Sequence, residues 1–300
     1  MANPMYGQNK FDNTLNVKGK INISGGIPVQ DSGGVAPVGG IVQPPWGVYN
    51  GAVPSGDGFN FADADPYAES ATQLFPLGST LDWGDRVFKY AQMNGAVTAG
   101  KLLQQAANIV AHHSQMSTTA IVAVSTTDTT DISVETAGDT DITLNQYQDG
   151  YLFVNDSGAG TGEGQSWKVK SHPAHDHSDD PSIVITVYGG VATALTTSSE
   201  LTLSQNVYKD VIVAPTAETG SVVGVTNIDM QDDYYGWMQV RGPKAVLASG
   251  TIVLGQKVTR SGGTAGACLV GADDVLMPIG QSMVSTLVSG EYALIDLSIA

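Results

Sequence analysis

The chain has 300 residues, which is enough for two compact domains or for one large β domain with a tail. Only 14 % of the residues are charged, against roughly 25 % in average soluble domains, and 36 are glycine, which together with abundant Thr, Ser and Val favours strands joined by tight turns. The net charge of −16 argues against direct nucleic-acid binding, because an acidic chain has no electrostatic reason to hold phosphate groups.

Cysteine usage and apolar run lengths exclude further classes. Cys268 is the single cysteine, so neither an intrachain disulfide nor a cysteine-based zinc site can form, and we expect a small buried strand residue there. No apolar run approaches the ~20 residues of a membrane span, and the N-terminus lacks the pattern of a signal peptide. We therefore expect synthesis in the cytoplasm and no membrane partner.

Residues 1–58 have the composition of an extended arm. Glycine pairs and prolines interrupt residues 25–58, and such a stretch should not build a core of its own. Apolar residues nevertheless recur at short intervals, where a solvated linker would carry polar ones. We predict that these residues anchor the arm on a partner: Ile27, Val29, Val35, Val38, Ile41, Val42, Trp46, Val48 and Tyr49.

Residues 59–116 read as short strands followed by one helix, packed with the C-terminal module. Turn residues at Gly78 and around Gly84 divide the strands between Leu74 and Tyr90. Residues 95–116 are the helix candidate, since apolar residues between Leu102 and Val110 recur at helical spacing. The opening of this stretch, up to Leu103, fits a strand equally well.

Two β modules follow. Residues 117–210 alternate apolar and polar positions, with strands spaced by turn signals as in a sandwich or barrel. Residues 211–300 form a second module, in which Gly255–Val258 faintly repeats Gly84–Val87. The sequence thus predicts a mainly β fold with two sandwich- or barrel-like modules, at most one helix and an extended Gly/Pro-rich N-terminal arm.

Few residues suggest chemistry. The polar stretch from His172 to Asp180 could ligate a divalent metal, but an exposed polar hairpin is the favoured interpretation. His112 and His113 suit the end of the predicted helix. Three Asp pairs should cap turns, and the glycine cluster of residues 158–164 lacks the Lys-Ser/Thr of a phosphate loop. The pairs are Asp63 with Asp65, Asp139 with Asp141, and Asp232 with Asp233. We expect no catalytic residue, no cofactor and no resident metal.

The C-terminal stretch carries a family resemblance. Residues 250–299 contain a Gly-x-x-x-Leu-Gly-Gln-Lys-Val strand, a Gly-Gly turn, Pro278-Ile-Gly280 and a closing Gly-Glu-Tyr-Ala-Leu-Ile-Asp-Leu strand. This resembles the small β-barrel decoration proteins of tailed phages, although Gln281 replaces the usual small residue after the glycine. Motifs across residues 70–300, such as Gly150–Asp156 and Tyr235–Pro243, resemble uncharacterised proteins of marine phages.

The resemblance implies a non-enzymatic structural protein of the virion. Its expected place is the outer surface of the capsid, where it would act as a decoration (cement) protein. Its expected partners are the major capsid protein and further copies of itself, with a trimer as the candidate oligomer. A tail or fibre-base protein, a capsid-forming subunit and a virion-bound glycan depolymerase remain the alternatives, in that order.

Overall fold

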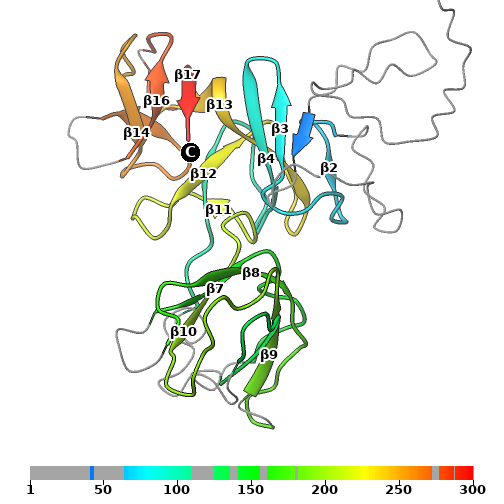
Figure 1. The fold of residues 1–300 in the computed structure, drawn as a ribbon. Coiled ribbons are helices and arrows are strands. Elements are labelled where there is room, and N and C mark those ends of the chain that lie inside the picture. The colour runs from blue at the N-terminus through cyan, green and yellow to red at the C-terminus, as the bar shows by residue number, and fades with distance from the viewer. Residues whose placement is uncertain are drawn as a thin grey trace, which may run out of the picture. The chain divides into compact units, whose positions relative to one another are not determined.

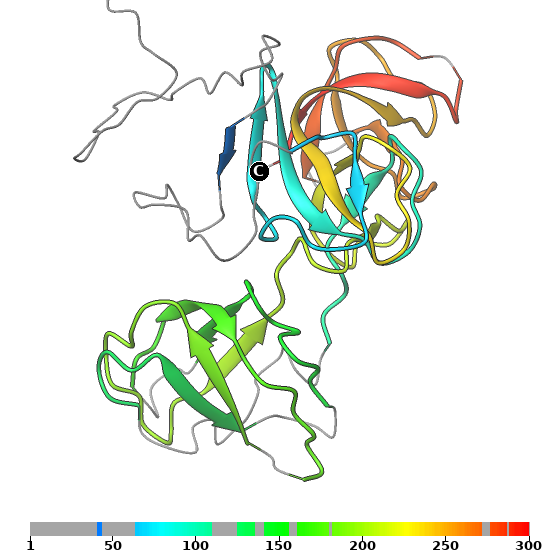
Figure 2. The same cartoon turned by 90° about the vertical axis from the view of Figure 1, so that its right-hand side faces the viewer.

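The computed structural model describes residues 64–109, 125–135, 141–155, 161–179, 182–271, 277–286 and 288–299, together with the backbone of Ile41–Gln43. Over these ranges the chain is all-β, and its strands pair antiparallel in one sheet of twelve strands and one of five (Figures 1 and 2). This confirms the predicted mainly β fold class with at most one helix.

The helix predicted for residues 95–116 is wrong for its described part, residues 95–109. Val97 forms an antiparallel bridge with Met230, and Leu102–Gln104 is strand β5. Leu102 and Leu103 are both buried but belong to different hydrophobic clusters, so both faces of β5 are covered. A strand buried on both faces has consecutive apolar residues, which resemble a helix in sequence.

The five-stranded sheet is formed by residues 131–204 and has its own core. Its strand order is β10-β7-β8-β9-β6, and the apolar residues of each strand alternate inward as the period-two pattern predicts. The strands are β6 (Asp131–Glu135), β7 (Tyr151–Val154), β8 (Ser166–Ser171), β9 (Ser182–Val187) and β10 (Leu201–Ser204). All the residues of its core cluster lie between Ile132 and Leu203, so this sheet folds around residues of its own.

The twelve-stranded sheet uses the chain on both sides of that segment. Its main path runs β1-β3-β4-β13-β17-β16-β14-β15, with β2, β5, β11 and β12 attached to the side. The strands before the five-stranded sheet are β1 (Ile41–Gln43), β2 (Glu69–Ser70), β3 (Thr80–Trp83), β4 (Arg86–Gln92) and β5. Those after it are β11 (Ile212–Val213), β12 (Val222–Thr226), β13 (Tyr235–Leu247), β14 (Lys257–Arg260), β15 (Cys268–Val270), β16 (Pro278–Ser282) and β17 (Tyr292–Ser298).

The twelve-stranded sheet contains the same strand arrangement twice. Repeat 1 consists of β4, β5, β11, β12 and residues 235–241 of β13. Repeat 2 consists of residues 241–247 of β13, then β14, β15, β16 and β17, in the same chain order. In both repeats the second strand pairs with the third and the fourth, and the fourth pairs with the fifth. Repeat 2 supplies the orange and red strands of Figure 1.

Individual hydrogen bonds recur between the repeats. Residues from β4 to β5 correspond to residues 155 positions later. Residues from β11 to β13 correspond to residues 56 or 57 positions later. The matching N-to-O bonds are Gly100 to Thr226 (3.0 Å) with Gly255 to Ser282 (2.8 Å), Val97 to Met230 (2.9 Å) with Ile252 to Thr286 (3.0 Å), Asn94 to Val211 (2.8 Å) with Ser249 to Cys268 (2.8 Å), and Ala214 to Leu102 (3.0 Å) with Gly271 to Lys257 (3.0 Å). Such agreement in register identifies the two repeats as copies of one module.

The long strand β13 joins the repeats. Its first half pairs with β4 and its second half with β17. Gly242 lies at the junction with φ +85°, and a Cβ atom there would lie 2.2 Å from the backbone oxygen of Asp85. Only glycine fits this combination of left-handed backbone and close approach, so Gly242 allows one strand to serve both repeats.

The five-stranded sheet is an insertion into repeat 1. It lies in the connection between β5 and β11, whose counterpart in repeat 2 is the connection of residues 261–267 between β14 and β15. The three hydrophobic clusters of the twelve-stranded sheet take no residue from 105–207. The two sheets therefore have separate cores although the chain between them is continuous.

Candidate functional site

Most of the predicted arm anchors lie outside the described residues. The exceptions are Ile41 and Val42, whose backbone forms β1 and pairs antiparallel with β3, opposite Asp82 and Leu81. Residues 41–43 of the arm therefore form the outermost strand of the main sheet path. The other seven anchors stay a prediction: Ile27, Val29, Val35, Val38, Trp46, Val48 and Tyr49.

The structure places a different apolar surface in repeat 2, and the sequence did not indicate it. Tyr292 and Leu294 point outward from β17, with 50 % and 36 % of each residue exposed. Leu247 and Ala245 lie directly opposite them on β13. Met283 follows β16 and donates its backbone N–H to the carbonyl of Leu294 at 2.9 Å. We call Ala245, Leu247, Met283, Tyr292 and Leu294 the repeat 2 face.

The strand register explains why these five side chains share one side. Directly opposed residues of antiparallel strands point to the same face, and residues two apart on a strand do so as well. Ala293 and Ile295, which alternate with Tyr292 and Leu294 along β17, are buried in the core of repeat 2. Tyr292 is further positioned by Gly100, because a Cβ atom at that residue would lie 2.6 Å from the tyrosine ring.

Other exposed apolar residues lie in repeat 2. The turn before β14 exposes Leu254 at 62 %, and Met277, next to β16, is 82 % exposed. The remaining examples are Val253, Val284 and Val288. Single exposed apolar residues are ordinary, but a concentration of them in one module indicates a surface that another molecule covers.

The equivalent face of repeat 1 is covered. Its residues, matched by register, are Tyr90, Gln92, Asn227, Tyr235 and Trp237. Trp237 and Tyr90 are almost fully buried, beneath a chain segment that precedes β3. Phe75 of that segment packs on both rings, with centroid distances of 5.2 Å to each. The Tyr90 hydroxyl also accepts the backbone N–H of Leu74 at 3.1 Å, and burial raises the pKa of this hydroxyl to about 12.

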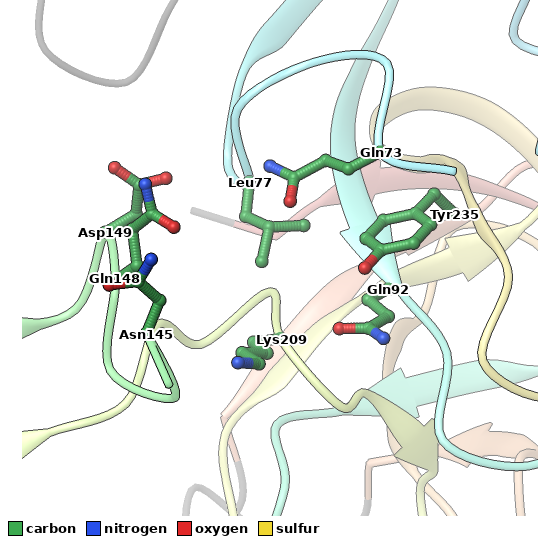
Figure 3. Close-up of a pocket in the computed structure, with 8 residues that line it drawn as sticks. All are labelled: Gln73, Leu77, Gln92, Asn145, Gln148, Asp149, Lys209 and Tyr235. Carbon is green, nitrogen blue, oxygen red and sulfur yellow. The ribbon is translucent and has the colours of Figure 1, made fainter. Parts of the chain in front are cut away.

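A small polar cavity of about 140 Å³ lies beside repeat 1 (Figure 3). Its lining residues are Gln73, Leu77, Gln92, Asn145, Gln148, Asp149, Lys209 and Tyr235. Burial raises the pKa of the Asp149 carboxyl, although the Lys168 ammonium opposes this, and burial lowers the pKa of Lys209. Lys209 donates to the carbonyl of Gln146 at 2.9 Å, and Gln73 donates to the carbonyl of Phe75 at 2.9 Å. The cavity can admit water or a small polar molecule, and two of its donors already serve the fold.

The histidine cluster is structural where the structure describes it. The sequence favoured an exposed hairpin, but His172 and His175 are buried. Both ring nitrogens of His172 have partners: Nε2 accepts the backbone N–H of Tyr147 at 3.0 Å, and Nδ1 lies 2.8 Å from the carbonyl of Pro173. Burial lowers the pKa of this imidazole. Within the described ranges, no group of three or more His, Cys, Asp or Glu residues could hold a metal ion.

The remaining candidates have local roles or lie outside the described residues. Asp65 accepts the backbone N–H of Tyr67 at 2.8 Å, as expected of a turn-capping residue, whereas Asp232 accepts the backbone N–H of Gly95, 137 positions away in the sequence. Cys268 is a buried residue of β15, and burial raises the pKa of its thiol to about 12. His112, His113, Asp63, Asp139 and Asp180 lie outside the described part of the chain.

No protein-family model, curated protein or solved structure matches the chain. Among the residues that the structure describes, no helix has the length and apolar character needed to cross a membrane.

Proposed function

We propose that this chain is a structural protein of a tailed-phage virion that binds the outside of the capsid as a decoration protein. The observation that carries the proposal is the repeat 2 face, an apolar surface on a rigid antiparallel module. Fully burying one Leu or Met side chain contributes about 1.5–3 kcal/mol, so several such residues on one face favour association with a partner.

The resemblance to decoration proteins falls on the same module. Residues 250–299 comprise most of repeat 2, and their motif segments coincide with β14, β16 and β17. Gly280, within the Pro-Ile-Gly motif, has a structural reason to be glycine, because a Cβ atom there would lie 2.1 Å from the backbone oxygen of Asp296. The motif and the exposed face therefore belong to one structural unit, which supports an assembly role for that unit.

The net charge limits the kind of partner. At −16 the chain would be repelled from an acidic surface and attracted to a basic one. A basic capsid lattice, on which neighbouring molecules cover the apolar face, would satisfy both features. Binding of the natural partner should then weaken moderately with added salt, since the apolar contribution does not depend on ionic strength in the same way.

Purified virions provide the test. Quantitative proteomics should find the protein in many copies per particle, and particles stripped of it should bind the purified chain again. Leu294→Asp should weaken this rebinding at least tenfold, whereas Val184→Asp should not, because Val184 is at least as exposed as Leu294 but lies on β9 of the inserted sheet. A handful of copies per particle would favour the tail or fibre-base alternative, and absence from particles would overturn the proposal.

A further inference from the structure

Repeat 1 shows what kind of segment covers this face of the module. The covering residues are Leu74, Phe75, Pro76 and Leu77, in which a proline separates two apolar side chains. Phe75 and Leu77 are both buried in the cluster that contains Trp237. Proline holds the segment extended and removes one backbone donor, so such a segment can lie across a strand face with few unsatisfied polar groups.

The arm contains the same pattern twice. Ile27-Pro28-Val29 and Ala36-Pro37-Val38 each place a proline between apolar residues, and Val35 precedes the second as Leu74 precedes Phe75. These segments lie within the 40 residues that precede β1. Forty residues can span up to about 130 Å when extended, so the reach of the arm does not restrict it to its own chain.

Charge is compatible with the arm on this surface. Three lysines and two aspartates give residues 1–40 a net charge of +1. Residues 41–300 therefore carry a net charge of −17, and the whole chain −16. Glu291 and Asp296 are exposed residues beside or on β17. Residues 241–299 have four basic and four acidic residues and no net charge, so the contrast with residues 1–40 is limited to Asp296, two residues from Leu294 on the same side of β17.

We propose that the repeat 2 face binds the Ile27–Val29 and Val35–Val38 segments of a second copy of this chain. Pairing of β1 with β3 holds residues 41–43 of the arm at one end of the main strand path, separated from β17 by β3, β4 and β13. A contact from that end to repeat 2 of a neighbour is heterologous, so it passes from copy to copy and closes a ring when the rotation allows. The proposal rests on the proposed function, because it makes the arm the link between copies on the particle.

Full-length variants test the contact in solution. Analytical ultracentrifugation should show concentration-dependent association of the wild-type chain. Leu294→Asp in the face, or Val29→Asp combined with Val38→Asp in the arm, should weaken association at least tenfold. Val184→Asp is the matched control and should leave association unchanged.

Mixing separates neighbours from a single chain. An equimolar mixture of the face variant and the arm variant should form a heterodimer, since one copy supplies an intact arm and the other an intact face. A wild-type chain that stays monomeric, or a mixture that gains no complex, would overturn the contact between copies. If such a chain still binds stripped particles through Leu294, the capsid subunit covers the face and the proposed function survives.

Cross-linking provides a second measurement that does not depend on aspartate being tolerated. Val38→Cys in one preparation and Leu294→Cys in another should form a disulfide-linked dimer on mixing under mild oxidation. Cys268 does not interfere, because it is fully buried. The matched pair Val38→Cys with Val184→Cys should not cross-link above the background, and equal cross-linking of both pairs would count against the assigned face.

Discussion

Trp237 and Leu294 occupy equivalent positions in the two repeats, yet Trp237 is 2 % exposed and Leu294 is 36 % exposed. Each follows the outward-facing tyrosine of its strand by two residues and lies opposite an equivalent position of the neighbouring strand. The backbone of the module is the same in both, so the difference arises from what lies above it. Residues 74–77 cover Trp237, and within the described part of the chain no equivalent segment covers Leu294.

We expect Trp237 and Leu294 to differ in how much stability is lost when each is truncated to alanine. Trp237→Ala should lower the free energy of unfolding by about 3–5 kcal/mol, because it leaves a cavity among the Phe75 and Tyr90 rings. Leu294→Ala should cost less than about 1 kcal/mol in the isolated protein, since little packing is lost at an exposed site. Urea denaturation of both variants checks this, and similar costs would show that the face is covered within the free chain.

The junction glycine predicts a second contrast. Gly242 and Gly250 have similar φ values of +85° and +89°, but a Cβ atom at Gly250 would meet nothing within 4 Å. Gly250→Ala should therefore cost only the ~1–2 kcal/mol of a left-handed alanine. Gly242→Ala must also separate β13 from Asp85, so it should destabilise more strongly. Thermal unfolding measures the difference, and equal shifts in melting temperature would contradict the tight contact.

His172 predicts a pH dependence of stability. Burial lowers its pKa below the ordinary value of 6.5, so the unfolded chain binds the proton more readily than the folded one. Stability is retained above pH 6.5, falls as the pH drops below it, and levels off beneath the folded-state pKa. His172→Gln should reduce this acid-dependent loss in denaturation curves between pH 7 and 5. His177→Gln is the control, and an unchanged slope in the His172 variant would assign the effect elsewhere.

The insertion predicts that the five-stranded sheet is separable. Replacing residues 106–205 with the seven-residue connection of repeat 2, Ser-Gly-Gly-Thr-Ala-Gly-Ala, should leave a folded twelve-stranded sheet. Residues 206–210 are kept, because Asn206 donates to the carbonyl of Leu77 at 3.3 Å and Tyr208 packs on the repeat 1 clusters. Circular dichroism should retain a β spectrum with cooperative unfolding, and stripped particles should still bind the shortened chain. Loss of cooperativity would mean that the inserted sheet stabilises repeat 1.

The sequence identified the candidate polar residues, but it did not show which of them are buried. The polar stretch after His172 was recognised, whereas its favoured interpretation as an exposed hairpin was wrong at His172 and His175. Ile142 pairs with His175, and Tyr147 donates to the His172 ring; both partners lie more than 20 residues away in sequence. The repeat 2 face was missed for a similar reason, because outward residues of β17 alternate with core residues and read as an ordinary amphipathic strand.

The sequence by itself determined the all-β class, because glycine turns and period-two apolar patterns are local properties of the chain. Tertiary structure decided the rest. Long-range pairing made Leu102–Gln104 a strand buried on both faces, where local spacing had suggested a helix. The duplication was hidden because an inserted sheet separates β5 from β11, and because the faint repeat seen at Gly84 and Gly255 has the wrong register: hydrogen bonding matches Gly255 with Gly100. Which apolar residues remain outside depends on what packs over each repeat, and that is a property of the folded chain alone.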